Sequence, residues 1–165
     1  MMHRQSSSQV RRQPQLPPGL CIKAAVIGFK RAIELEAGNA EFWNALGVVT
    51  SGLNPKVAQH AFVRSLHLNE LNAKVWTNLG VLYLLQGDNK LAHAAFGRAQ
   101  STDPDYAHAW VGEGLIALLL GDTYEALSHF THAFEISDAS SIITRRQYHC
   151  RLTVPRRTKI SMSRR

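Results

Sequence analysis

The chain has few of the residues that cross-link small secreted proteins. Its 165 residues include only two cysteines, Cys21 and Cys150, which lie at opposite ends and form no CxxC pair. We therefore expect neither a disulfide framework nor a cysteine-based zinc site. The longest apolar run, residues 115–120, is far too short to span a bilayer. No apolar stretch follows the N-terminal basic residues, so we expect no secretory signal and a cytoplasmic protein, with the nucleus as the alternative compartment.

Acidic residues are missing from both ends of the chain. All twelve lie in residues 21–138 beside eight Lys and Arg, which gives that segment a net charge of 8 − 12 = −4. The ends carry the other eleven basic residues and no acid, hence +11, and the sum is the +7 of the whole chain. The high isoelectric point therefore describes the ends and not the middle. We expect residues 1–20 and 139–165 to be disordered basic tails around one folded domain at 21–138.

Catalytic and metal-binding patterns are also missing. The sequence contains no phosphate-binding loop, no GxSxG and no HExxH. Asp103 and Asp105 flank a proline, which is typical of a turn. A metal site needs three or four placed ligands, and the chain offers one weak cluster, made of His129, His132, His149 and Cys150. We expect no enzyme, no metal or other cofactor, and no small-molecule substrate.

What the chain does have is a repeat. Its three tryptophans, Trp43, Trp76 and Trp110, are spaced 33 and 34 residues apart. Small residues and aromatics recur at fixed distances after each of them, and a 34-residue period with this pattern resembles the tetratricopeptide repeat (TPR), a helix–turn–helix unit. The signature positions that are filled are Trp43, Leu46, Gly47, Ala58, Phe62, Trp76, Leu79, Gly80, Tyr83, Ala92, Phe96, Ala99, Pro104, Trp110, Gly114, Ala126, Phe130 and Ala133. The third copy departs from the pattern at three positions, with Glu113, Ala117 and Asp138.

This resemblance implies an all-α TPR solenoid of three full helix–turn–helix repeats preceded by one lone second helix. The lone helix is indicated by Ala25, Phe29 and Ala32, which fit the second-helix signature before Trp43. Its own first helix would fall on residues 5–20, where three prolines and few apolar residues argue against a helix. We expect helices at 22–36, 40–51, 55–69, 73–86, 89–102, 107–120 and 123–137.

The residue types at the signature positions predict how the two helices of a repeat meet. The glycine after the leucine should lie where the first helix touches the second, because a side chain there would push them apart. The phenylalanines should fill the space between the helices. Asn54 before Pro55 and Asp122 before Glu125 are typical N-terminal caps, while Gly87 and Gly121 mark the turns within repeats.

A TPR solenoid offers its inner surface, lined by the first helices, to a peptide or a partner helix. Aligning the three copies predicts a partner groove made of Asn44, Val48, Lys74, Thr77, Val81, Leu84, His108, Val111, Leu115 and Leu118. Only Lys74 and Asn44 could hold a terminal carboxylate, so a carboxylate clamp of the chaperone-binding kind is not expected. The apolar lining favours an apolar partner or further repeats. Alternatively, some of these leucines are partly buried between adjacent repeats.

Three segments go beyond the generic repeat. Residues 31–49, 58–62 and 75–84 are similar to the large TPR scaffold subunit of the superkiller (Ski) complex, with a likeness that runs from about residue 30 to 135. Members of that family are much longer, so the chain would match an internal portion. The resemblance implies a scaffold that holds an RNA helicase and WD-repeat subunits, in an assembly that feeds messenger RNA to the cytoplasmic exosome.

Two other functions stay open. One is an unrelated TPR adaptor that binds a peptide or helix in the apolar groove. The other is RNA association through the basic ends, in which binding would weaken steeply with salt. The residues that could neutralise phosphates are Arg145, Arg146, Arg156, Arg157, Lys159, Arg164 and Arg165. The same basic residues also fit a solvated tail or a short nuclear-import signal. We expect protein partners, no membrane association, and at most weak or indirect RNA binding.

Overall fold

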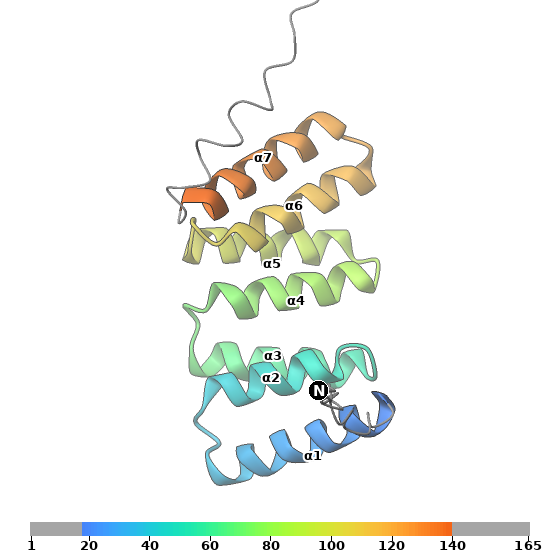
Figure 1. The fold of residues 1–165 in the computed structure, drawn as a ribbon, viewed down its shortest axis with the longest axis vertical. Coiled ribbons are helices and arrows are strands. Elements are labelled where there is room, and N and C mark those ends of the chain that lie inside the picture. The colour runs from blue at the N-terminus through green and yellow to red at the C-terminus, as the bar shows by residue number, and fades with distance from the viewer. Residues whose placement is uncertain (1–17, 140–165) are drawn as a thin grey trace, which may run out of the picture.

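The computed structural model describes residues 18–139, and these form a stack of seven helices without a strand. The helices are α1 (Pro18–Leu35), α2 (Ala40–Thr50), α3 (Pro55–Leu68), α4 (Ala73–Leu85), α5 (Asn89–Thr102), α6 (Ala107–Leu120) and α7 (Thr123–Ala139). Figure 1 shows them stacked in chain order from α1 at the bottom to α7 at the top. Three antiparallel pairs, α2/α3, α4/α5 and α6/α7, are preceded by the single helix α1. Within residues 18–139 the predicted all-α solenoid with one lone leading helix is confirmed.

The predicted boundaries hold to within a few residues, except at the first helix. Helix α1 begins at Pro18, four residues before the expected start. Proline suits the first helical turn, where its missing N–H would have no partner within the helix. The predicted disordered basic tails otherwise fall on residues 1–17 and 140–165, outside the described residues, and they stay predictions.

Short polar side chains fix where most helices begin. Asn54 Oδ1 accepts a hydrogen bond from Val57 N (3.3 Å) and Asp122 Oδ1 accepts one from Glu125 N (2.9 Å), as the sequence predicted. Asn39, Asn72 and Asp88 cap α2, α4 and α5 in the same way. Each cap satisfies one of the backbone donors that the first helical turn leaves without a partner.

Each tryptophan ties its first helix to the loop before it. The indole N–H of Trp43 donates to the carbonyl of Ala37 at 3.0 Å, and those of Trp76 and Trp110 donate to the carbonyls of Glu70 and Pro104 at 3.0 and 2.9 Å. The acceptor lies six residues before the tryptophan in every repeat. Because the bond recurs with the period of the sequence, it joins α2, α4 and α6 to their preceding loops in the same way.

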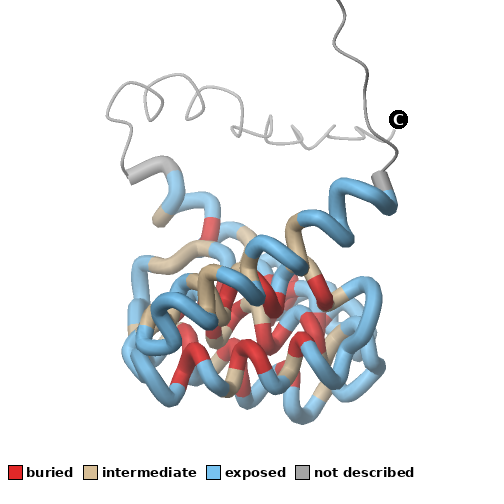
Figure 2. Tube along the Cα trace, turned by 90° about the horizontal axis from the view of Figure 1, so that it is seen from below, coloured by how far each residue is buried: buried red, intermediate tan, exposed pale blue. Residues whose placement is uncertain are grey.

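The core lies between the helices of each repeat and between neighbouring repeats. Figure 2 shows the buried residues inside the stack and the exposed ones around its outside. Phe62 and Phe96 are almost completely buried, and both pack with residues of the following repeat: Phe62 with Val75 and Leu79, Phe96 with Ile116. Burial between repeats as well as within them makes each unit depend on its neighbour.

The glycine that follows the signature leucine lies against the phenylalanine ring of the same repeat, as the sequence predicted. A Cβ built on Gly47 would lie 2.5 Å from the Phe62 ring, and one built on Gly80 would lie 2.7 Å from that of Phe96. Gly114 meets Phe130 at 2.5 Å in the same manner. Real Cβ atoms do not approach other atoms so closely, so these positions require glycine in the present packing.

Candidate protein-interaction face

The first helices α2, α4 and α6 share one row of exposed apolar side chains. Val48, Val81 and Leu115 occupy equivalent positions, five residues after each tryptophan, and are 49%, 42% and 42% exposed. Leu85 and Leu119 continue the apolar surface of α4 and α6. We call this surface the first-helix face, and it comprises Val48, Lys74, Val81, Leu84, Leu85, His108, Val111, Leu115, Leu118 and Leu119.

Two residues of the predicted groove do not reach this face. Asn44 and Thr77, equivalent positions in the first and second repeats, are only 3% and 5% exposed. Asn44 Oδ1 accepts a hydrogen bond from Asn78 Nδ2 at 2.9 Å, which joins α2 to α4 across the boundary between repeats. The groove prediction for these two residues is therefore corrected, because the first helix of the following repeat covers them.

The remaining predicted groove residues differ in burial. Val48, Lys74, Val81, His108, Val111, Leu115 and Leu118 are exposed. Leu84 is partly buried against the cluster formed by Ala92, Phe96 and Ile116, which is the inter-repeat burial that the sequence left open as an alternative. Leu118, its counterpart in the third repeat, stays exposed.

Charge on the first-helix face is sparse and partly neutralised. Lys74 Nζ lies 3.7 Å from Glu41 Oε2, and Glu41 also accepts a hydrogen bond from Asn72 Nδ2 at 3.1 Å. Both charged side chains are more than half exposed, so the pair adds little stability. It does place an anion beside the one lysine that could have held a terminal carboxylate. The face is therefore built for apolar contacts.

Sequence reasoning missed a buried carboxylate between the second and third repeats. Glu113 stands where the first two repeats have the buried leucines Leu46 and Leu79. Its Oε2 lies 2.7 Å from Nδ1 of His93 on α5, and its Oε1 has no hydrogen-bond partner among the described residues. The sequence does show that Glu113 departs from the repeat pattern. Its pairing with His93 could not be predicted, because His93 lies twenty residues away and only the fold brings the two together.

Replacing Glu113 with leucine is expected to raise the free energy of unfolding by about 1–4 kcal/mol, because a carboxylate that costs free energy to bury gives way to the apolar residue of the other repeats. His93 keeps its hydration, since its side chain is 71% exposed while that of Glu113 is 7% exposed. Urea denaturation followed by circular dichroism measures the change. The matched control is Glu36→Leu, an exposed carboxylate just after α1, which should move stability by less than about 0.5 kcal/mol. A loss of stability in Glu113→Leu would show that the pair stabilises the repeat boundary.

The histidines weighed as metal ligands have structural partners. His132 packs edge-on against Trp110, with ring centroids 4.3 Å apart, where the first two repeats place Arg64 and Arg98 over their tryptophans. His129 Nε2 lies 3.7 Å from Glu125 Oε1. Within residues 18–139 no group of three or more His, Cys, Asp or Glu side chains is placed to hold a metal ion, and His149 and Cys150 lie outside them.

Two further observations concern the ionisation of Tyr106 and the apolarity of the helices. Burial raises the pKa of the Tyr106 phenol, and the nearby carboxylate of Asp103 adds to the rise. The Tyr106 ring lies beside that of His108, with centroids 5.2 Å apart. Among the helices of the described residues, none combines the length and apolarity needed to cross a membrane.

Comparison with known proteins gives the same repeat assignment. Residues 86–138 match the family model described as tetratricopeptide repeat. A 78-residue stretch is 48% identical to Tetratricopeptide repeat protein 37 of Xenopus laevis. The aligned stretch covers 46% of this chain and 5% of that protein. The chain therefore corresponds to a small part of that relative's length.

Solved structures resemble the fold over most of the chain. A crystal structure of MamA superposes with a TM-score of 0.64 at 25% identity, covering 72% of this chain and 70% of MamA. A second MamA structure gives 0.62 at 25% identity, covering 74% and 68%. The helix order, the match over residues 86–138 and the sequence relative support the tetratricopeptide-repeat family, and residues 18–139 form an all-α solenoid of that fold.

Proposed function

We propose that the protein is a non-catalytic protein–protein interaction scaffold, and that its first-helix face holds the apolar side of a partner helix or peptide. The observation that carries this is the row of Val48, Val81 and Leu115, which stay exposed at the same position of three successive repeats. Apolar surface repeated at this spacing is typical of binding sites and is costly to leave in water. An amphipathic helix laid across α2, α4 and α6 would cover it.

The proposal is tested by introducing negative charges into the row of exposed apolar residues. Val81→Asp and Leu115→Asp together are expected to weaken partner binding at least tenfold, about 1.4 kcal/mol or more, because each buries a carboxylate against an apolar partner. Leu71→Asp is the control, since Leu71 is highly exposed in the loop between α3 and α4, away from the row. Circular dichroism must show all three proteins equally helical. Unchanged affinity in the charged double variant would exclude the face as the binding surface.

We further propose that the partners are subunits of a superkiller-type complex, namely an RNA helicase and WD-repeat proteins, in support of cytoplasmic messenger RNA decay. The support is the similarity of residues 31–49, 58–62 and 75–84 to the scaffold subunit of that complex. Residues 31–49 run from the end of α1 into α2, and the other two segments lie on α3 and α4.

Affinity purification of the full chain from nuclease-treated extract tests the assembly. Helicase and WD-repeat subunits identified by mass spectrometry, and lost from Val81→Asp/Leu115→Asp, would support it. Their absence from the wild-type eluate would restrict the likeness to ancestry.

An unrelated adaptor is the second candidate, and the apolar character of the first-helix face favours it independently of any resemblance. It predicts tight binding of isolated amphipathic peptides to the full chain, with the same sensitivity to the charged double variant. Binding that needs no helicase or WD-repeat subunit would distinguish it from the superkiller-type scaffold.

A further inference from the structure

The C-terminal end of the described solenoid presents a face that is covered at every earlier repeat. One residue after each tryptophan come Asn44, Thr77 and Val111, and the first two are buried beneath the first helix of the following repeat. Val111 has no such helix over it within residues 18–139 and is 39% exposed. The same position thus changes from core to surface where the stack of described helices ends.

The second helices of the repeats, α3, α5 and α7, show the same change from a position that contacts the following repeat to one that is exposed. Gln59 of α3 donates a hydrogen bond to the Tyr83 hydroxyl of α4 at 3.1 Å, and His93 of α5 meets Glu113 of α6. Both residues therefore contact the following repeat. The equivalent residue of α7 is Leu127, an apolar side chain that is 63% exposed.

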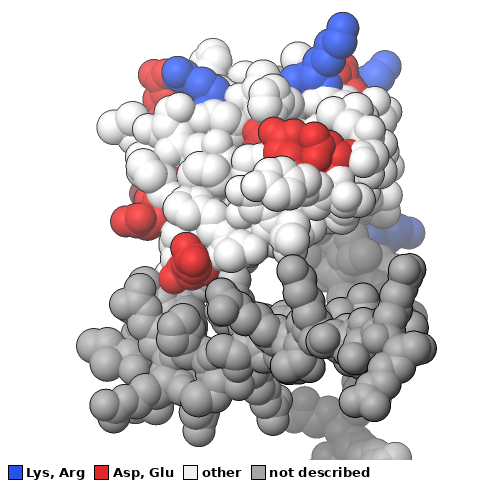
Figure 3. All heavy atoms as spheres, turned by 90° about the horizontal axis from the view of Figure 1, so that it is seen from above, with Lys and Arg blue, Asp and Glu red and all other residues white. Residues whose placement is uncertain are grey.

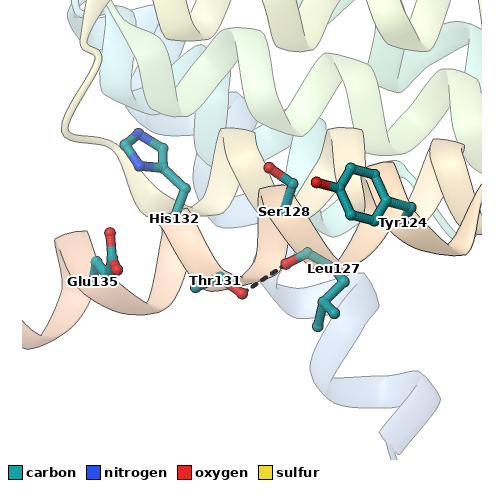
Figure 4. Close-up of a pocket in the computed structure, with 6 residues that line it drawn as sticks. All are labelled: Tyr124, Leu127, Ser128, Thr131, His132 and Glu135. Atoms are coloured by element: carbon teal, nitrogen blue, oxygen red, sulfur yellow. Dashed lines mark hydrogen bonds between the residues drawn. The ribbon is translucent and has the colours of Figure 1, made fainter.

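A shallow cavity of about 410 Å³ follows this side of α7. It is lined by Tyr124, Leu127, Ser128, Thr131, His132 and Glu135, which extend along the helix in Figure 4. We call Tyr124, Leu127 and Glu135, together with Val111 and Leu118 at the edge of the first-helix face, the C-terminal end face. It combines apolar side chains with a carboxylate at one margin.

The opposite end of the stack also carries unpaired apolar surface. Helix α1 turns Ala25, Phe29 and Ala32 toward α2, and these residues are partly buried. Its other side exposes Leu20, Lys23, Ile27 and Lys30, spaced three or four residues apart, so they lie in one stripe. We call these four residues the α1 stripe.

The two ends are opposite in charge. Between residues 99 and 137 the structure exposes five acids, Asp103, Asp105, Asp122, Glu125 and Glu135, and that range holds no Lys or Arg, whereas α1 contains three Lys and Arg and one acid. In the view onto the α7 end, Asp and Glu patches lie among uncharged atoms, and the Lys and Arg atoms lie toward the edge (Figure 3). Lys23 and Lys30 make no ion pair with the residues that the structure describes. Complementary potentials of this kind steer association and fix its direction.

We propose that the C-terminal end face of one copy binds the α1 stripe of a second copy. The contact places Leu20 and Ile27 against Leu127 and Val111, and it brings the lysines of the stripe to the acidic margin that includes Glu135. The two surfaces are different, so the contact is heterologous and leaves one free end on each side of a dimer. Such contacts continue into open chains unless the rotation closes a ring.

Light scattering after size exclusion tests this with the full chain. The wild type is expected to exceed the 18.4 kDa of one chain, and its mass should rise with concentration. Leu127→Asp removes one surface and Ile27→Asp the other, so each variant alone is expected to run as a monomer. Leu71→Asp, a change at a still more exposed residue on a loop away from both ends, should behave as the wild type.

Mixing the two variants gives the decisive result. Each keeps the surface that the other has lost, so an equimolar mixture is expected to form a one-to-one dimer of twice the monomer mass and no larger species. A symmetric contact between two α7 faces predicts instead that Ile27→Asp alone forms a dimer and that Leu127→Asp stays monomeric beside it in the mixture.

Three outcomes would overturn the proposal. One is a wild type that stays monomeric at every concentration, and another is a mixture that stays monomeric while the wild type associates. The third is association that survives Ile27→Asp but is lost when residues 140–165 are deleted. That result would mean that residues 140–165, and not the α1 stripe, bind the C-terminal end face. Equal helicity of all variants by circular dichroism is required throughout.

Discussion

Replacing Phe96 with alanine is expected to lower the free energy of unfolding by about 3–5 kcal/mol. The ring is fully buried and lies against glycines of two repeats, Gly80 of its own and Gly112 of the next. It also packs with Ile116 in the cluster between the second and third repeats. Truncation leaves a cavity that cannot close without moving α4 and α6 together, so the cost falls at the upper end for a buried aromatic.

Phe130 provides the matched control for this measurement. It holds the same signature position in the last repeat, against Gly114, but it is only partly buried because no further helix of the described residues packs on it. Phe130→Ala is therefore expected to cost clearly less than Phe96→Ala in urea denaturation. Equal losses, or a loss below about 1 kcal/mol for Phe96→Ala, would contradict the packing described.

The second large effect is expected from adding a side chain where the helices touch. Gly80→Val places a Cβ 2.7 Å from the Phe96 ring, so either the ring or α4 must move. Overpacking of this kind costs about 1–3 kcal/mol. Gly97→Val is the control, because Gly97 is also helical but a Cβ there meets nothing within 4 Å. Its stability should change by less than about 0.5 kcal/mol.

Combining Gly80→Val with Phe96→Ala separates the clash from any intrinsic effect of valine. The two residues touch, so their changes should not add, and valine should be far less harmful once the ring is gone. Additive losses would mean that Gly80 is needed for a reason other than its contact with Phe96.

The sequence predicted those contacts that recur with the period of the repeat. Gly47, Gly80 and Gly114 were predicted to lie where the helices touch, and each meets the phenylalanine fifteen or sixteen residues later. The caps at Asn54 and Asp122 were predicted equally well, because a cap depends on residues three positions apart. Local and periodic features can be inferred from one chain since they require no knowledge of the neighbouring repeat.

Features that depend on the neighbouring repeat could not be predicted as reliably. Asn44 and Thr77 were assigned to the groove from their alignment, yet their burial is decided by the helix that follows. The pairing of Glu113 with His93 joins one departure from the pattern to a residue outside the signature, across a repeat boundary. The groove stays a proposal, and the observation that supports it is the exposure of Val48, Val81 and Leu115.

The three indole hydrogen bonds have a consequence for how the molecule can be observed. Trp43, Trp76 and Trp110 are the only tryptophans of the chain, and each is fastened to the loop that opens its own repeat. Their fluorescence therefore divides into three optical signals, one for each structural unit. Variants that keep a single tryptophan would report whether the repeats melt together or one after another from an end. The order in which the three signals change would show at which end of the helix stack unfolding begins.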